Sequence, residues 1–290
     1  MQQLNFEAGG GGLASQTALG YGCITDMEII LQPDAAAAAL LVARVIAREI
    51  RRKPNLVLGL ATGRTMEAVY AHLARLHRAE GVSFAACRTF NLDEYIGLPP
   101  EHPASYRQYM NRHLFSKVDI DLKNTHLPDG TAPDLQAECL RYERWIVECG
   151  GIDLQLLGIG RAGHIGFNEP MSALRSRTRD KTLMRSTLEQ NAAMFGGDPD
   201  QVPHRAITMG VGTILESRRC LLLATGQEKA DIIAKALEGP ITSRVTASAL
   251  QLHPHCTVVV DHAAAAHLEE VEYYRWIFES EPEWHNFKEN

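Results

Sequence analysis

Short apolar runs alternate with longer segments of helical pattern along most of the chain. Each run is five to seven residues long and bounded by turn or helix signals, and most are rich in Val or Leu, as a buried strand would be. Strands that are apolar on both faces are typical of parallel sheets covered by helices. The predicted strands lie at residues 55–61, 87–92, 153–158, 220–224 and 256–261.

Helical segments separate these runs. Asp34 can cap a helix that continues through an alanine-rich stretch to about Arg52. The other predicted helices run from the turn at 62–65 to about 78, over 133–149, over about 227–237, and from about 263 toward the C-terminus. The alternation predicts an α/β fold of the doubly wound, Rossmann-like kind, with a mostly parallel sheet and helices on both faces.

The domain organisation follows from the same pattern. Residues 1–22 contain four consecutive glycines and little hydrophobic pattern, which indicates a flexible leader. Residues 23–290 then form a single α/β domain, a size near the upper limit for one hydrophobic core.

Composition and charge exclude several classes of protein. The net charge is −6, with 29 Lys and Arg among 35 Asp and Glu, so no basic footprint for nucleic acid exists. The most apolar stretch, residues 35–47, is too short to span a bilayer and contains Arg44. No secretory signal precedes it, so we expect a cytoplasmic protein without membrane or nucleic-acid partners.

The cysteines and histidines give no metal signature. The six cysteines form no C-x-x-C pair, so reduced, mostly structural thiols are expected. The twelve histidines show no H-E-x-x-H or comparable ligand spacing. We therefore predict no metal.

Polar segments follow three of the predicted strands. They are the turn Thr62-Gly63-Arg64-Thr65, the pair Asp93-Glu94, and the loop from Gly160 to Glu169. In open parallel sheets, ligands bind beyond the carboxyl ends of the strands. The three segments therefore predict one shared site.

Each segment has a chemical and a structural interpretation. The turn at 62–65 offers backbone amides and hydroxyls to a phosphate at the start of a helix, or it is an ordinary helix entry; the local sequence leaves both open. Asp93 could be a general base, whereas an isolated Asp-Glu pair more often forms a solvated turn.

The loop at 158–163 formally matches G-x-G-x-x-G after a strand. A dinucleotide site would need a helix to begin there, and Gly166 and Pro170 disfavour a long helix. A glycine loop that presents His164 and Glu169 fits acid–base chemistry better, because a carboxylate can orient an imidazole and stabilise its charged form.

Longer motifs give the chain a family resemblance. These motifs are FNLDEYIGLP (90–99), HPASY (102–106), GHIGFNEP (163–170), SRTR (176–179) and LQLHP (250–254). Through them, in order and with compatible spacing from about Val57 to the C-terminal helix, the chain resembles glucosamine-6-phosphate deaminases. These belong to the glucosamine-6-phosphate isomerase/6-phosphogluconolactonase superfamily. The related lactonases lack the NLDEY and FNEP elements, which favours a deaminase.

The resemblance implies a cofactor-free deaminase of the hydrolase class, which isomerises glucosamine 6-phosphate and releases fructose 6-phosphate and ammonia. By similarity, His164 opens the sugar ring with support from Glu169, and Asp93 removes the C2 proton. The phosphate of the sugar would be held by Thr62, Gly63, Thr65 and Lys229.

The chain departs from the family pattern at four positions. Ala162 stands where Asp or Asn usually precedes the loop histidine by two residues. Arg64 replaces a second glycine of the phosphate turn, and Met66 stands where Pro is common. An arginine of the lid that contacts phosphate in some members aligns with Ala193, and Arg64 could restore that charge.

The resemblance also implies a mobile lid and an effector site. Residues 184–203 match the lid of the family, whose closure would exclude water. Positions that bind an N-acetylated sugar phosphate in regulated members match Ser172, Arg179, Lys181 and Thr182. A homo-oligomer is compatible with the sequence.

Three other functions compete with the deaminase. The first is a sugar-lactone hydrolase on the same fold. The second is a sugar-phosphate-binding regulator without catalysis, for which Ala162 is the reason. The third is a dinucleotide-dependent dehydrogenase that uses the glycine loop. Release of ammonia from glucosamine 6-phosphate would separate the deaminase from all three.

Overall fold

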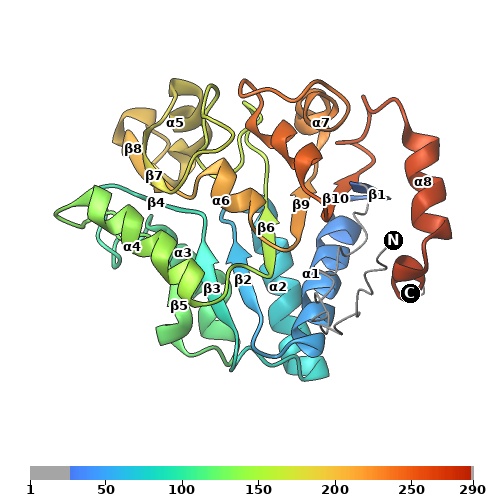
Figure 1. Cartoon of the computed structure of the whole chain (residues 1–290), viewed down its shortest axis with the longest axis horizontal. Helices are drawn as coiled ribbons and strands as arrows, with labels where there is room; N and C mark the ends of the chain where they lie inside the picture. Colours follow the sequence, from blue (N-terminus) through green and yellow to red (C-terminus); the bar gives the residue numbers. More distant parts are fainter. Residues whose placement is uncertain (1–26, 289–290) are drawn as a thin grey trace, which may run out of the picture.

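A parallel sheet of seven strands forms the centre of the protein (Figure 1). The computed structural model describes residues 27–288, so the predicted leader lies outside the described residues. The strand order is β1-β10-β9-β6-β2-β3-β5, and every neighbouring pair is parallel. The strands are β1 (Glu28–Gln32), β2 (Val57–Leu60), β3 (Arg88–Asn91), β5 (Thr125–His126), β6 (Leu154–Leu157), β9 (Cys220–Ala224) and β10 (Cys256–Asp261).

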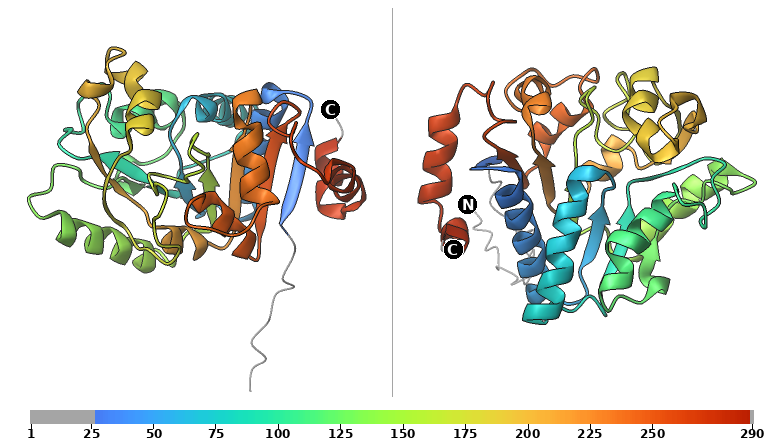
Figure 2. Two further views of the ribbon diagram at one scale, coloured as in Figure 1. Left: turned by 90° about the horizontal axis from the view of Figure 1, so that it is seen from above. Right: turned by 180° about the vertical axis from the view of Figure 1, so that it is seen from behind.

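Helices cover both faces of this sheet. The helices α1 and α2 pack against each other on one face, and α4 lies on the opposite face (Figure 2). This arrangement confirms the predicted doubly wound α/β fold. The helices are α1 (Ala35–Arg52), α2 (Arg64–Glu80), α3 (Tyr106–His113), α4 (Leu135–Glu148), α5 (Arg185–Asn191), α6 (Val211–Leu215), α7 (Ala230–Leu237), α8 (Val271–Ser280) and α9 (His285–Lys288).

Local sequence signals set several of these boundaries. The carboxylate of Asp34 accepts a hydrogen bond from the Ala37 N–H at 2.8 Å, as predicted for the cap of α1. Gly81, in the left-handed conformation with φ of 67°, ends α2. Strands β9 and β10 are buried along their whole length, which explains their continuous apolar sequences.

A second, smaller sheet was not predicted. It contains β4 (Asp93–Tyr95), β8 (Arg205–Thr208) and β7 (Arg179–Thr182) in the order β4-β8-β7, with antiparallel pairing. Together with α5 it lies at one end of the molecule, beyond the carboxyl ends of the main strands (Figure 1). The predicted lid at 184–203 contains α5 and two short 3-10 helices. Its mobility stays a prediction.

The C-terminal helix begins later than predicted. Residues 262–267 form turns, and α8 starts at Val271 rather than near Ala263. Just before this segment, the Asp261 carboxylate accepts the N–H groups of Ala264 and Gly226 at 2.8 and 3.0 Å. Within residues 27–288, none of the helices is both long and apolar enough to cross a membrane.

Candidate active site

The predicted site residues gather at the carboxyl edge of the main sheet. Strands β9, β6, β2 and β3 are consecutive neighbours in the sheet. The segments that follow them carry Lys229, the 158–169 loop, the turn at 62–65 and Asp93, respectively. Parallel strands end at the same edge, so residues distant in sequence become neighbours there.

Asp93 begins β4 directly after β3, and its backbone pairs with Thr208 of β8. Its side chain is buried, with 5% exposed. Gly166 of the 158–169 loop lies beside it: a Cβ atom there would be 3.5 Å from Asp93 Oδ2 and 3.0 Å from Thr208 Oγ1. Burial, and then the charge of Glu94, raises the pKa of Asp93 to about 8. Asp93 is therefore a buried carboxyl with the basicity that proton abstraction from carbon needs.

His164 and Glu169 form a buried pair within the loop after β6. The Nδ1 atom of His164 lies 3.1 Å from Glu169 Oε2, and both side chains are almost fully buried. Burial tends to raise the pKa of Glu169, but His164, the Thr187 hydroxyl and the Met184 N–H together leave that pKa below its usual range. The carboxylate is thus ionised beside the imidazole, the arrangement expected for a histidine that transfers protons.

Gly160 makes room for the His164 imidazole. A Cβ atom on Gly160 would lie 2.0 Å from His164 Nε2, so the ring occupies the space of a missing side chain. The Gly160 N–H also donates to the His164 carbonyl at 2.9 Å. Turns, rather than a helix, follow this loop over residues 161–172. The helix that a dinucleotide site would require does not begin here.

The predicted phosphate turn opens α2. Gly63 is the N-cap with φ of 112°, a conformation that favours glycine, and its carbonyl accepts a hydrogen bond from Tyr109 Oη at 2.8 Å. Arg64 is the first helical residue and is exposed, while Thr62 and Thr65 are half-buried. The turn thus presents a helix N-terminus and hydroxyls at the carboxyl edge of the sheet.

Lys229 reaches the same edge from the segment after β9. Its Nζ atom donates to the Ile159 carbonyl at 2.8 Å, which places the cation beside the loop after β6. Burial lowers the pKa of Lys229, with Glu228 opposing and Arg161 reinforcing this shift. A partly desolvated ammonium group is suited to an anionic ligand.

The four candidate effector residues fall into two groups. The buried Ser172 hydroxyl donates to the Glu169 carbonyl at 2.7 Å, and Arg179 Nη1 donates to Asn168 Oδ1 at 2.9 Å. Both are therefore tied to the loop that carries His164. In contrast, Lys181 and Thr182 lie further along β7, half-buried and exposed respectively. The effector role stays a prediction.

Sequence reasoning missed several residues that shape the site. Thr208 Oγ1 accepts the Phe167 N–H at 3.0 Å, and Asn168 Nδ2 donates to the Ile165 and Met209 carbonyls at 2.9 and 2.8 Å. Asn168 lies inside the GHIGFNEP motif, but nothing in the sequence near Thr208 indicates this contact. Within residues 27–288, no group of three or more His, Cys, Asp or Glu side chains could hold a metal ion.

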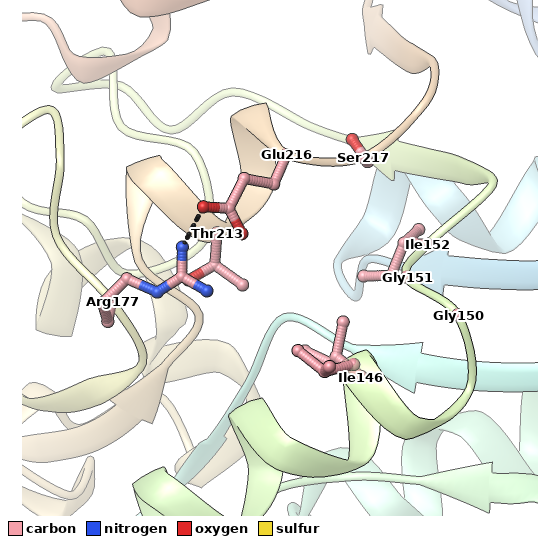
Figure 3. Close-up of a pocket in the computed structure, with 9 residues that line it drawn as sticks. Ile146, Gly150, Gly151, Ile152, Arg177, Thr213, Glu216 and Ser217 are labelled. Atoms are coloured by element: carbon pink, nitrogen blue, oxygen red, sulfur yellow. Dashed lines mark hydrogen bonds and ion pairs between the residues drawn. The ribbon is translucent and has the colours of Figure 1, made fainter. Parts of the chain in front are cut away.

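A separate pocket lies at the other end of the strands, away from the predicted site. It has a volume of about 330 Å³, and the ion pair between Arg177 and Glu216 crosses its rim at 2.5 Å (Figure 3). Its other walls include Ile146 of α4 and the segment 150–152, which precedes β6. The pocket is thus near the amino ends of the strands and contains none of the predicted catalytic residues.

Comparison with known proteins gives a consistent result. Residues 32–260 match the family described as glucosamine-6-phosphate isomerases/6-phosphogluconolactonase. The glucosamine-6-phosphate deaminase of Streptomyces coelicolor is 52% identical over 258 residues, which covers 89% of this chain and 99% of that protein. Glucosamine-6-phosphate deaminase 2 of Giardia intestinalis is 54% identical over 233 residues, covering 80% and 89%.

Solved structures agree with this assignment. The structure of a monomeric glucosamine-6-phosphate deaminase superposes with a TM-score of 0.81 at 46% identity, and covers 83% of this chain and 100% of that one. The 6-phosphogluconolactonase of Trypanosoma cruzi superposes with a TM-score of 0.67 over 84% of this chain and 97% of that one, at 20% identity, which shows the shared fold. The family match spans most of the sequence, and the deaminases remain similar over nearly their whole length. The chain belongs to the family of glucosamine-6-phosphate isomerases and 6-phosphogluconolactonases.

Proposed function

We propose that the protein converts glucosamine 6-phosphate and water into fructose 6-phosphate and ammonia. The observation that carries the proposal is the buried His164–Glu169 pair in the loop whose Gly166 lies against the buried Asp93 carboxyl. One group can then open the sugar ring while the other takes a proton from carbon. The deaminases of about 50% identity support the same reaction.

The first step is ring opening by His164. The imidazole accepts the proton of the O1 hydroxyl and returns a proton to O5 as the C1–O5 bond breaks, which yields the open-chain aldehyde. Glu169, held at 3.1 Å from Nδ1, stabilises the imidazolium that exists between these two transfers. Ala162 supplies no second carboxylate, so this support rests on Glu169.

The second step is proton transfer by Asp93. The ionised carboxylate removes the C2 proton, the C1–C2 double bond forms, and the C1 oxygen takes a proton from the ammonium group of the substrate, which gives an enolamine. Return of the proton from Asp93 to C1 leaves an iminium at C2. Water adds to C2, and ammonia leaves as the C2 carbonyl forms. Because a water molecule is consumed, we place the reaction among the hydrolases.

The substrate would be bound through its phosphate. The turn Thr62-Gly63-Arg64-Thr65 offers the free amides of the α2 N-terminus, and Lys229 offers a partly buried cation. We also propose that residues 184–203 act as a lid. Glu169 Oε1 accepts the Met184 N–H at 3.0 Å, so a movement of this segment would reach the catalytic pair.

A coupled assay tests the proposal. The protein is incubated with glucosamine 6-phosphate, and both fructose 6-phosphate and ammonia are measured; we expect them in equal amounts. A parallel reaction with 6-phosphogluconolactone tests the lactonase function. Binding of glucosamine 6-phosphate without either product would instead favour a binding-only regulator. A cytoplasmic location and a homo-oligomer stay predictions from the sequence.

A further inference from the structure

Glu94 is a buried carboxylate next to the proposed base, and the reaction just described does not use it. It is the middle residue of β4, with 4% of its surface exposed. Its Oε1 atom accepts the N–H groups of Tyr95 and Tyr106 at 2.9 and 3.0 Å, and its Oε2 atom accepts the Arg107 N–H at 3.0 Å. These three bonds account for the burial of a charged group.

Two of the three donors belong to the first turn of α3. Amides of a first helical turn have no partner within the helix, and the helix dipole favours a negative charge beside them. The side-chain oxygen of Ser105, the N-cap residue, accepts the Gln108 N–H at 3.1 Å, which leaves the Tyr106 and Arg107 N–H groups to Glu94. Glu94 therefore completes the capping of α3 from a different element, and this fixes β4 against the helix.

The helix that Glu94 holds contacts two other parts of the site. The ring of Tyr106 stacks on Phe167 of the catalytic loop, with 6.0 Å between ring centroids. One turn later, Tyr109 Oη donates to the Gly63 carbonyl in the phosphate turn at 2.8 Å. A shift of α3 relative to β4 would thus change the position of Asp93 relative to both His164 and the phosphate turn.

We propose that Glu94 is a positioning residue of the reaction: it sets the position of Asp93 by tying β4 to α3, and it supplies the negative charge that acts on the Asp93 carboxyl. This inference rests on the proposed function, in which Asp93 is the base. Glu94 itself need not touch the substrate.

The charges around the two carboxyls support this role. Burial raises the pKa of Asp93, and the charge of Glu94 adds to that rise. Burial also raises the pKa of Glu94, but its three N–H partners and Arg107 oppose the rise. These donors favour the ionised form of Glu94.

Three tyrosines also face Asp93. Tyr95 of β4, Tyr106 of α3 and Tyr142 of α4 all interact with its carboxyl, and burial raises the pKa of each above its usual range. They stay neutral over the pH range in which Asp93 titrates. The charge of Glu94 is therefore the one whose removal should lower the pKa of Asp93.

Glu94→Gln tests both parts of the proposal. The amide keeps the shape of the side chain but lacks the charge and one of the two acceptor oxygens. We expect kcat to fall by up to ~10²-fold with a smaller change in KM, the size expected for a misplaced catalytic group. We also expect the midpoint of the Asp93 titration to move to lower pH. The titration is followed by ¹³C NMR of protein labelled at aspartate carboxyls, with Asp93→Asn to assign the signal.

Two further variants separate positioning from simple stability. Ser105→Ala weakens the same helix end without changing any charge, so the Asp93 midpoint should stay in place. Glu94→Asp keeps the charge but has a shorter reach, so kcat should fall while the midpoint stays close to that of the native protein. If Glu94→Gln does not fold, a native kcat in Glu94→Asp overturns the proposal.

An Asp93 midpoint that does not move in folded Glu94→Gln would also overturn it, because Glu94 would then be a helix anchor alone. The NMR titration needs no turnover. If the native protein fails to release ammonia from glucosamine 6-phosphate, the proposed function fails, and the effect of Glu94 on Asp93 can still be measured by itself.

Discussion

Asp93 must be ionised to take a proton from carbon, and its buried position makes ionisation costly. Its pKa is raised to about 8, so at neutral pH most of the free protein holds it protonated. We expect kcat/KM for glucosamine 6-phosphate to rise with pH and reach half of its maximum near that value. The measurement is kcat/KM against pH, which reports the free enzyme. A profile already flat between pH 5 and 9 would contradict the assignment.

Loss of the basic carboxylate of Asp93 should reduce kcat strongly and affect substrate binding little. Asp93→Asn keeps the size of the side chain, and loss of a general base typically costs ~10²–10⁴-fold in rate. We expect kcat to fall by that amount while glucosamine 6-phosphate still binds. A variant that keeps more than about a tenth of the native kcat would show that Asp93 is not the base.

Gly160 offers a test of the catalytic histidine through a residue with no side chain. In Gly160→Ala the new methyl group would lie 2.0 Å from His164 Nε2, so the imidazole must move away from Glu169 or the loop must shift. We expect kcat to fall by up to ~10²-fold. Gly158→Ala is the matched control in the same loop, because its methyl group meets only the flexible end of Met66 at 3.2 Å. Equal losses in both variants would contradict a specific effect on His164.

Lys229 should contribute to binding more than to the chemical step. Lys229→Ala removes a charged hydrogen-bond donor, and such contacts are worth about 1.5–3 kcal/mol. The loss should appear mainly in KM if the ammonium group binds substrate and transition state equally. Lys235→Ala, at an exposed position of α7, is the control for charge alone. An unchanged KM in Lys229→Ala would rule Lys229 out as a ligand.

At the scale of elements, the strands that could be predicted are those whose apolar residues are consecutive in the sequence. All five predicted strands are present, and β9 and β10 have the predicted bounds, because runs such as Cys220–Ala224 are apolar and covered on both faces. The small antiparallel sheet was not predicted, because its strands lack such an apolar run. Strand β7, Arg179–Thr182, is short and entirely polar, and its partner β8 lies more than twenty residues later. No local sequence pattern predicts the pairing of two strands so far apart in the chain.

The site, too, has features that the sequence predicts and features that it does not. Asp93 and the 164–169 loop could be placed together because each follows a predicted strand, and strand ends converge in a parallel sheet. The contact of Gly160 with the imidazole and the capping of α3 by Glu94 could not. Both depend on atoms brought together by tertiary packing, and glycine and glutamate have many other uses in loops and strands.

The cap of α1 is an element-scale prediction with a simple test. Asp34 accepts the Ala37 N–H at 2.8 Å, and Ala at an N-cap in place of Asp typically costs about 1 kcal/mol. We expect Asp34→Ala to lower the free energy of unfolding by that amount in urea denaturation. Asp34→Asn keeps an acceptor oxygen and should cost much less. Equal losses in the two variants would mean that the cap contributes through its charge rather than through the hydrogen bond.

At the scale of the whole molecule, one ligand would connect segments that the chain keeps far apart. The turn at 62–65, Asp93, the 164–169 loop and Lys229 come from four neighbouring strands of a single sheet. A sugar phosphate that contacts all four must therefore bind the folded protein and not the unfolded chain. Its binding free energy then adds to the free energy of unfolding of the entire sheet.

Asp93→Asn allows this coupling to be measured, because it should bind glucosamine 6-phosphate without consuming it. At a ligand concentration of 100 times Kd, binding should stabilise the fold by about 2.7 kcal/mol. For a chain of this size, that corresponds to a rise in Tm on the order of 5–10 °C. Glucosamine without phosphate should produce almost no rise, and Lys229→Ala in the same background should need a higher concentration for the same effect. A rise of equal size with glucosamine alone would place the binding energy in the sugar rather than in the phosphate turn and Lys229.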